Sequence, residues 1–168
     1  MHRARGPWVR DLWWACRCEP SPVSLPSDGS GGDLVHATCV AVDGRGLLIL
    51  GSSGSGKSSL AIQMIALGAE LVGDDLIRLT PTAGRPVAQV ANPDIAAIEA
   101  RGIGLLPVLL RDSVPLWAVL DLNHSESDRY PSQDRKYLCM GHSLPLLFRV
   151  EGAQFAASLL LYLRGLSD

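Results

Sequence analysis

The feature that most constrains this chain of 168 residues is a glycine-rich loop between an apolar strand and a helix. Residues 46–51 are typical of a buried strand, and Ser58 to Leu67 is typical of a helix that Gly68 ends. Between them lies Gly51-Ser52-Ser53-Gly54-Ser55-Gly56-Lys57-Ser58. Small residues allow successive backbone N–H groups to turn toward one anion. The arrangement therefore predicts a nucleotide-phosphate site in an α/β fold.

Position within the loop suggests a role for each polar residue. The N-terminal end of the helix adds its positive dipole, and Lys57 is expected to reach the β- and γ-phosphates. The Ser58 hydroxyl is expected to bind Mg²⁺. Lys57 is one of two lysines in the chain, which argues against a generic surface charge. The motif therefore predicts ATP and Mg²⁺ as ligands, against the alternative of a plain Gly/Ser-rich turn.

Composition bounds the class of protein. The chain is 47% hydrophobic with a formal net charge of -2, which predicts one globular domain and argues against binding to nucleic acid or an anionic membrane by bulk electrostatics. No secretory signal or membrane span is recognised, so a cytoplasmic location is expected. Residues 1–33 end in a Ser/Gly/Asp run and are predicted to be a flexible or disordered extension, with the catalytic domain at 34–168. Cys16, Cys18, Cys39 and Cys139 are expected to be reduced thiols.

Residue patterns predict a series of strands with few helices. Besides the helix after the loop, short helices are predicted from Asp94 to Ala100, where Asn92 caps the start, and from Gln154 to Arg164. The last two strands are expected to form a hairpin through Gly141, and consecutive strands to pair antiparallel. Strands are predicted over residues 35–42, 46–51, 70–72, 76–79, 105–110, 115–122, 136–140 and 145–150.

Two adjacent carboxylates interrupt the apolar sequence after the predicted strand 70–72. Asp74 and Asp75 follow Lys57 by about seventeen residues. Phosphoryl transfer needs a carboxylate for the metal and another as base toward an acceptor hydroxyl, and neighbours on a strand face opposite sides. A solvated turn is the alternative for this pair. Asp121 is a rival for the metal because it ends an apolar strand, although we favour Asp75.

With these residues in view, the segment from about Val35 to Leu163 resembles the catalytic domain of bacterial HPr kinase/phosphorylase. The resemblance covers about three quarters of the chain, and its strength lies in the order and spacing of several motifs. These are His36-Ala37-Thr38, the glycine-rich loop, Asp74-Asp75, Glu99-Ala100-Arg101-Gly102-Ile103-Gly104 and Asp128-Arg129.

The resemblance implies a fold, an assembly and a substrate. The fold would be a P-loop-containing mixed β-sheet flanked by helices, like the nucleotide-binding domain of phosphoenolpyruvate carboxykinase, assembled into hexamers. In such enzymes Mg-ATP phosphorylates a serine of HPr, a small phosphocarrier protein of the sugar phosphotransferase system. Many members also remove that phosphate with inorganic phosphate and release pyrophosphate.

The resemblance also implies roles for individual residues. Asp74 or Asp75 would be the base, with His36 beside it, and Glu99 would help Ser58 and Asp75 to hold Mg²⁺. Arg101 would lie in the catalytic segment, and Arg129 would stabilise the transferring phosphoryl group. The alternatives are an ordinary strand histidine at His36, an ion pair at a helix end for Glu99 and Arg101, and a solvated arginine at Arg129.

Two departures from the family pattern limit what carries over. Members have an additional N-terminal domain, so this chain looks like a short form. Where the family has a Pro-Gly-Arg-Asn stretch tied to dephosphorylation, this chain has Val150-Glu151-Gly152-Ala153-Gln154, so we expect weak or absent phosphorylase activity. A small-molecule kinase using the same loop and a non-catalytic nucleotide sensor stay open as alternatives.

Overall fold

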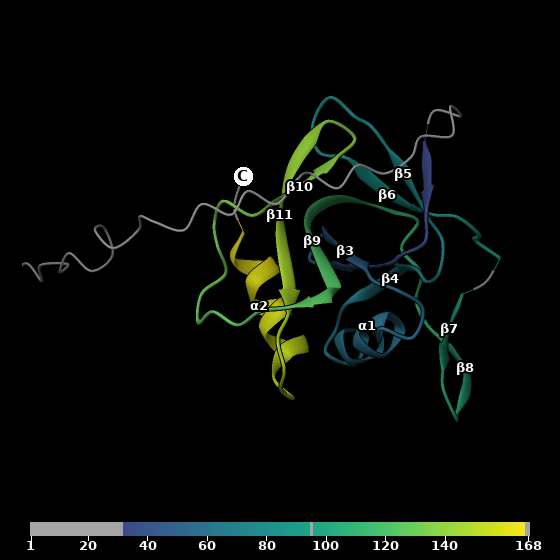
Figure 1. The fold of residues 1–168 in the computed structure, drawn as a ribbon. Coiled ribbons are helices and arrows are strands. Elements are labelled where there is room, and N and C mark those ends of the chain that lie inside the picture. Colours follow the sequence, from purple (N-terminus) through teal and green to yellow (C-terminus); the bar gives the residue numbers. More distant parts are fainter. Residues whose placement is uncertain (1–31, 95, 167–168) are drawn as a thin grey trace, which may run out of the picture.

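The structure is a computed structural model that describes residues 32–94 and 96–166 (Figure 1). The predicted extension therefore lies outside the described residues, apart from its last two positions. Asp33 is already the first residue of a strand. The boundary between extension and domain stays a prediction.

Nine strands form one mixed sheet in the order β1-β5-β6-β9-β3-β2-β4, with β11 also beside β9 and β10 beside β11. The remaining two strands, β7 and β8, form a separate hairpin (Figure 1). The strands are β1 (Asp33–Val35), β2 (Thr38–Val42), β3 (Arg45–Leu50), β4 (Glu70–Gly73), β5 (Ile77–Thr80), β6 (Val87–Val90), β7 (Ala97–Ala100), β8 (Gly104–Pro107), β9 (Ser113–Ser125), β10 (Lys136–Cys139) and β11 (His142–Arg149).

The long strand β9 joins the two halves of the sheet. Its first residues pair antiparallel with β6, and its later residues pair parallel with both β3 and β11. Strand β3 is paired on both sides, which agrees with its nearly continuous apolar sequence. A parallel strand on each side of β9 therefore holds the segment that ends near Asp121.

Alternate residues of the central strands face two separate apolar clusters. Leu47 and Ile49 of β3 pack toward the helices, whereas Leu48 packs toward β5, β6, β10 and β11. This period of two is the one expected for a pleated strand. The sheet is therefore buried on both faces, by helices on one side and by its own curled outer strands on the other.

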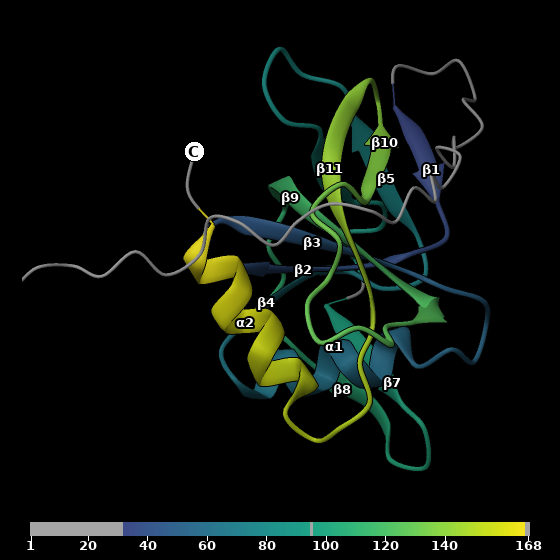
Figure 2. The same ribbon diagram turned by 60° about the vertical axis from the view of Figure 1, so that its left-hand side comes forward.

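Both helices cover the same face of the sheet (Figure 2). Helix α1 (Lys57–Ala66) buries Leu60 and Met64, and helix α2 (Phe155–Gly165) buries Leu159 and Leu163, all in one cluster. Their apolar residues recur three or four positions apart, as in amphipathic helices. Neither of these two described helices is long and apolar enough to cross a membrane.

The two described cysteines are buried free thiols, as predicted. Burial raises the pKa of Cys139 to about 11 and also raises the pKa of Cys39. Both thiols therefore stay protonated and unreactive near neutral pH. Cys16 and Cys18 lie outside the described residues.

The predicted helix from Asp94 to Ala100 is wrong. The Asn92 side chain accepts a hydrogen bond from the Asp94 N–H at 3.2 Å, as a capping residue would, but the chain then forms strand β7. The reason is tertiary: Ile98 is buried in the helix-side cluster while Glu99 is exposed, and β7 pairs with β8. Alternating burial and pairing override a short local helix signal.

The strand predictions need three further corrections. The single strand predicted for residues 35–42 is broken at His36 and Ala37, between β1 and β2. Strand β6 was not predicted, and the expected pairing of consecutive strands is wrong for β9, which lies beside β6, β3 and β11 rather than β8 and β10. The hairpin through Gly141 is confirmed, because β10 and β11 pair antiparallel around it.

Candidate functional site

Four central strands run in the same direction. Strands β3 and β4 both pair antiparallel with β2, while β9 lies parallel to β3 and β11 parallel to β9. All four therefore end at one edge of the sheet, in Leu50, Gly73, Ser125 and Arg149. In α/β sheets, ligands bind outside the carboxyl ends of such strands. The glycine-rich loop and the carboxylate pair both follow strands that end at this edge.

The loop between β3 and α1 requires glycine at defined positions. A Cβ atom on Gly51 would collide with the Ser55 side chain. Gly56 caps the N-terminus of α1 in the left-handed region, with φ of 98°. The Ser55 N–H donates to the Ser52 carbonyl across 3.1 Å, which closes a tight turn inside the loop. The spacing of glycines therefore serves the backbone path of the loop.

Lys57 places a buried cation inside the loop. Its side chain is 6% exposed, and its Nζ donates to the Gly51 carbonyl at 3.0 Å and the Ser52 carbonyl at 3.3 Å. His36, at the bend between β1 and β2, brings its Nε2 to 3.4 Å from Lys57 Nζ. Two residues that lie 21 positions apart therefore meet at the loop. The resemblance implied His36 beside the carboxylate base, and that placement stays a prediction.

Asp74 and Asp75 lie in a bend directly after β4, not on the strand itself. The Asp74 carboxylate is half-buried and accepts a hydrogen bond from the Thr38 hydroxyl at 2.5 Å. Asp75 is exposed, with φ of 69°, and the Leu76 N–H donates to the Asp74 carbonyl across it at 2.9 Å. This is a γ-turn with a positive central φ, a rare and strained conformation. The turn gives the two carboxylates different surroundings.

Asp121 also reaches this edge, in register beside Leu50, but both of its oxygens are engaged by later residues of the same strand, β9. Oδ1 accepts from the Asn123 N–H at 2.9 Å, and Oδ2 lies 2.8 Å from His124 Nδ1. Asn123 in turn accepts the Ser52 N–H on its Oδ1 at 2.9 Å. Asp121 therefore orients Asn123 against the glycine-rich loop.

Arg149 is a second residue that braces the loop. It ends β11, and its Nη2 donates to the Ser55 carbonyl. Sequence reasoning did not assign Arg149, Asn123 or Thr38 to this part of the site, because each contact depends on strand register. For Asn123 and Arg149, the available signal was a polar residue near the end of a predicted strand.

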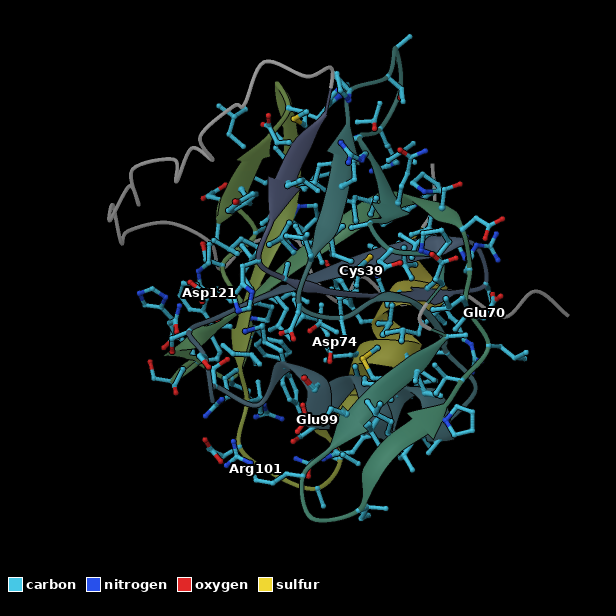
Figure 3. All side chains as sticks on the ribbon, turned by 90° about the vertical axis from the view of Figure 1, so that its right-hand side faces the viewer. Cys39, Glu70, Asp74, Glu99, Arg101 and Asp121 are labelled. Carbon is cyan, nitrogen blue, oxygen red and sulfur yellow. The ribbon has the colours of Figure 1, made fainter. Side chains whose placement is uncertain are left out.

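The other predicted site residues lie apart from the loop. Glu99 and Arg101 are exposed on the β7–β8 hairpin, and Figure 3 shows them below Asp74 on that side of the molecule. Among the described residues, neither one forms a hydrogen bond or ion pair with the loop. Arg129 is exposed in the segment between β9 and β10, with its guanidinium 5.7 Å from the Tyr130 ring centroid. The structure brings His36 to Lys57 and leaves these three apart.

No three His, Cys, Asp or Glu residues gather as a metal-binding cluster within residues 32–94 and 96–166. Mg²⁺ often keeps several waters and uses one or two protein oxygens together with phosphate oxygens. Ser58, half-buried in the first turn of α1, and the nearby carboxylate pair are donors of the kind that such a site uses. The donor set therefore fits a magnesium ion that arrives with a nucleotide.

Part of the chain is similar to a known protein family. The family model described as "HPr Serine kinase C-terminal domain" matches residues 30–111. This part of the chain, just under half of its 168 residues, is similar to that family. The match includes His36, the glycine-rich loop, Asp74-Asp75 and the β7–β8 hairpin, and it stops before Asn123, Arg129 and Arg149.

Two curated relatives that match part of this chain are both named HPr kinase/phosphorylase. The HPr kinase/phosphorylase of Caldanaerobacter subterraneus subsp. tengcongensis is 35% identical over 105 residues, which cover 57% of this chain and 34% of that protein. The HPr kinase/phosphorylase of Lachnoclostridium phytofermentans is 42% identical over 76 residues, 44% of this chain and 24% of that protein. This chain therefore spans about a third or less of these relatives.

A solved structure shares the fold of this chain. The HPr(Ser) kinase/phosphatase from Coxiella burnetii matches with a TM-score of 0.65 and 21% identity, covering 79% of this chain and 88% of that chain. The likeness confirms the predicted mixed α/β fold, with a large mixed sheet and packed helices.

Proposed function

We propose that this chain is an ATP-dependent protein-serine kinase that phosphorylates HPr or a related phosphocarrier of the phosphotransferase system. One observation carries the proposal: the buried Lys57 ammonium lies among the carbonyls of a glycine-rich loop and 3.4 Å from His36. Both residues fall inside the segment that matches the HPr serine kinase C-terminal domain. The loop that we propose as the phosphate site therefore lies within the segment that matches the family model.

We propose that the loop is a P-loop and that the fold resembles the nucleotide-binding domain of phosphoenolpyruvate carboxykinase. Lys57 would exchange its hydrogen bonds to Gly51 and Ser52 for bonds to the β- and γ-phosphates. Mg²⁺, when bound, would neutralise charge on the phosphate oxygens, held by Ser58 with Asp75 and, after movement of the β7–β8 hairpin, Glu99. Arg101 of the same hairpin would then lie beside the transferring group.

In the proposed reaction, the serine hydroxyl oxygen of the acceptor attacks the γ-phosphorus, and the bond from that phosphorus to the ADP oxygen breaks. The hydroxyl proton passes to a carboxylate, for which we propose Asp74. A base works best when a second group orients it, and Thr38 holds the Asp74 carboxylate at 2.5 Å. Asp75 faces solvent, where an incoming protein would meet it, and Arg129 would have to move to stabilise the phosphoryl group.

The proposed nucleotide and acceptor both belong to the cytoplasm, and we expect the protein to act there. We also propose that the chain forms homo-oligomers, with a hexamer as the expected size. Light scattering of the purified protein at several concentrations would measure that assembly.

Incubation with γ-labelled ATP, Mg²⁺ and purified HPr tests the proposed function. We expect label on an HPr serine with wild type, and at least about a hundredfold less with Lys57→Ala, because the transition state loses a buried cation. A matched control is Lys136→Gln, which removes the exposed lysine on β10.

Two other outcomes would overturn the proposal. When a cell lysate replaces HPr in the assay, label transferred to a metabolite rather than to any protein would indicate a small-molecule kinase. Tight ATP binding without transfer to HPr or to any lysate component would indicate a nucleotide sensor. Strong residual transfer in Lys57→Ala would contradict the assignment of the loop.

A further inference from the structure

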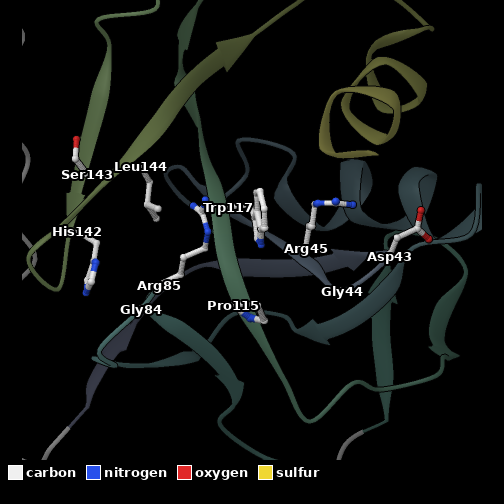
Figure 4. A pocket seen from close by; sticks show the side chains of 10 residues that line it. All are labelled: Asp43, Gly44, Arg45, Gly84, Arg85, Pro115, Trp117, His142, Ser143 and Leu144. Atoms are coloured by element: carbon white, nitrogen blue, oxygen red, sulfur yellow. The ribbon is translucent and has the colours of Figure 1, made fainter. Parts of the chain in front are cut away.

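A cavity of about 750 Å³ opens at the end of β3 that is remote from the glycine-rich loop (Figure 4). Three turns meet there: Asp43-Gly44 before β3, Gly84-Arg85 before β6, and His142 at the start of β11. The glycine-rich loop follows the opposite end of β3. At a rise of about 3.3 Å per residue, this six-residue strand separates the two places by about 17 Å. The cavity is therefore distinct from the candidate site, and its volume suits a small ligand.

Trp117 is turned into this cavity by a β-bulge. Gly46 of β3 pairs with Leu116 of β9, but the next residue, Leu47, pairs with Ala118, so Trp117 is an extra residue in the ladder. Bulges re-aim side chains and often occur beside binding sites. Trp117 is 7% exposed, yet the two apolar clusters of the described residues do not include it. Its burial comes from the side chains that line the cavity.

Two arginines lie against the Trp117 ring. The Arg85 guanidinium is 3.9 Å from the ring centroid and the Arg45 guanidinium is 4.9 Å from it. Figure 4 shows Trp117 between them. Cation–π contact and stacking fix the orientation of a guanidinium. The N–H groups at the edge of the guanidinium stay free to donate hydrogen bonds to other partners. The bulge therefore presents two arginines to one cavity in fixed positions.

The charge of these arginines is not balanced within the described part of the chain. Asp43, the acidic residue of the cavity wall, pairs with Arg164 at 3.0 Å instead. No described carboxylate forms an ion pair with Arg45 or Arg85, and the buried Nε of Arg45 has no hydrogen-bond partner. A buried guanidinium N–H without a partner is costly, and it is satisfied by an anion or a carbonyl. Ser143 adds a neutral hydroxyl donor to the wall.

We propose that this cavity binds a small organic anion, held through its phosphate or carboxylate groups by Arg45 and Arg85. The planar fork of each guanidinium matches both groups through paired hydrogen bonds. The proposal does not depend on the kinase activity, because the cavity and the glycine-rich loop share no lining residue.

Titration calorimetry with inorganic pyrophosphate and with citrate tests the proposal and separates phosphate from carboxylate ligands. The titrations use the Lys57→Ala protein without Mg²⁺, so that binding at the glycine-rich loop is removed. We expect saturable binding of at least one anion, weakened about tenfold or more by added Arg85→Lys or Arg45→Lys, which keep the charge but lose the fork. Added Lys136→Gln, on the opposite face of the β10–β11 hairpin from Tyr137, should change the affinity by less than about twofold.

Thermal unfolding with and without each anion gives a second readout. A bound anion raises the melting temperature of the parent protein by mass action, and the arginine variants should lose that increase. If Arg45→Lys is too unstable to study, Arg85→Lys at the exposed turn carries the test. The proposal is overturned if neither anion binds at millimolar concentration, or if both arginine variants bind as the parent does. If the arginine variants lose the same amount of thermal stability with and without anion, the stack of arginines on Trp117 has a purely structural role.

Discussion

The Thr38 hydroxyl, at the first residue of β2, donates a hydrogen bond to the Asp74 carboxylate across 2.5 Å. It joins two residues that lie 36 positions apart and fixes Asp74 at the edge where β3 and β4 end. We expect Thr38→Val to lower kcat for HPr phosphorylation about tenfold while the KM for ATP stays within about threefold, because the base loses its orientation but the loop is intact. Thr38→Ser should restore most of the turnover. Equal loss in Thr38→Ser and Thr38→Val would contradict an orienting hydroxyl.

The three carboxylates at this edge should differ in their effect on catalysis. We expect Asp74→Asn and Asp75→Asn each to remove at least about 99% of transfer while ATP affinity stays within about tenfold. Asp121→Asn should leave transfer within about threefold, because both Asp121 oxygens are already engaged by Asn123 and His124 of the same strand. Single-turnover assays with parallel nucleotide titrations would measure both quantities. Loss of transfer in Asp121→Asn alone would move the metal site to β9.

The reverse reaction should be weak. Inorganic phosphate needs cationic donors near the phosphoserine, but Arg149 already donates to the Ser55 carbonyl, and Glu151 is an exposed negative charge two residues later. Phosphoserine-HPr incubated with the protein, Mg²⁺ and millimolar phosphate should release pyrophosphate at less than about 1% of the forward rate. We expect Glu151→Gln to raise that release. Comparable forward and reverse rates in the wild type would refute this prediction.

Stability should depend on pH through Glu126. Arg135 donates to its carboxylate at 2.6 Å, and this hydrogen bond holds the pKa of Glu126 below its ordinary value. A carboxyl with a lowered folded-state pKa stabilises the fold above its unfolded pKa, near 4.3, and loses that contribution as the pH falls through the folded value. We therefore expect Glu126→Gln to melt below wild type at pH 7, with the difference closing below about pH 4.

Thermal unfolding between pH 3 and 8 would measure this difference. Glu151→Gln is the matched control, because Glu151 is exposed and forms no ion pair among the described residues. A melting difference for Glu126→Gln that does not change with pH would show that the loss comes from packing rather than from ionisation.

The local parts of the site could be predicted from sequence because their signals are short-range. Gly56 and Gly68 mark the two ends of α1 within a residue or two, and the loop needs only the residues between them. The approach of His36 to Lys57 was not predicted, because the family resemblance implied His36 beside the carboxylate base. Short-range signals therefore identified the loop, and the resemblance only singled out His36 as a site residue.

The rest depended on register, which sequence patterns do not determine. Asn123 meets Ser52 because β9 lies parallel to β3, a pairing of distant strands that was not predicted. The β7 segment was predicted as a helix because its capping residue is local, whereas the burial of Ile98 is not. Residues brought in by distant strands were therefore the ones that reasoning from sequence missed.

The γ-turn centred on Asp75 affects how variation at this position should be interpreted. A φ of 69° is tolerated by Gly, Asn and Asp far better than by other residues, so backbone geometry alone restricts position 75 to a short set of residue types. Aspartate at this position in relatives would therefore not by itself show that the carboxylate takes part in the reaction. Asn keeps the turn and removes the charge, whereas Ala removes the charge and strains the turn. Comparing Asp75→Asn with Asp75→Ala therefore separates a requirement for the carboxylate from a requirement for the turn conformation.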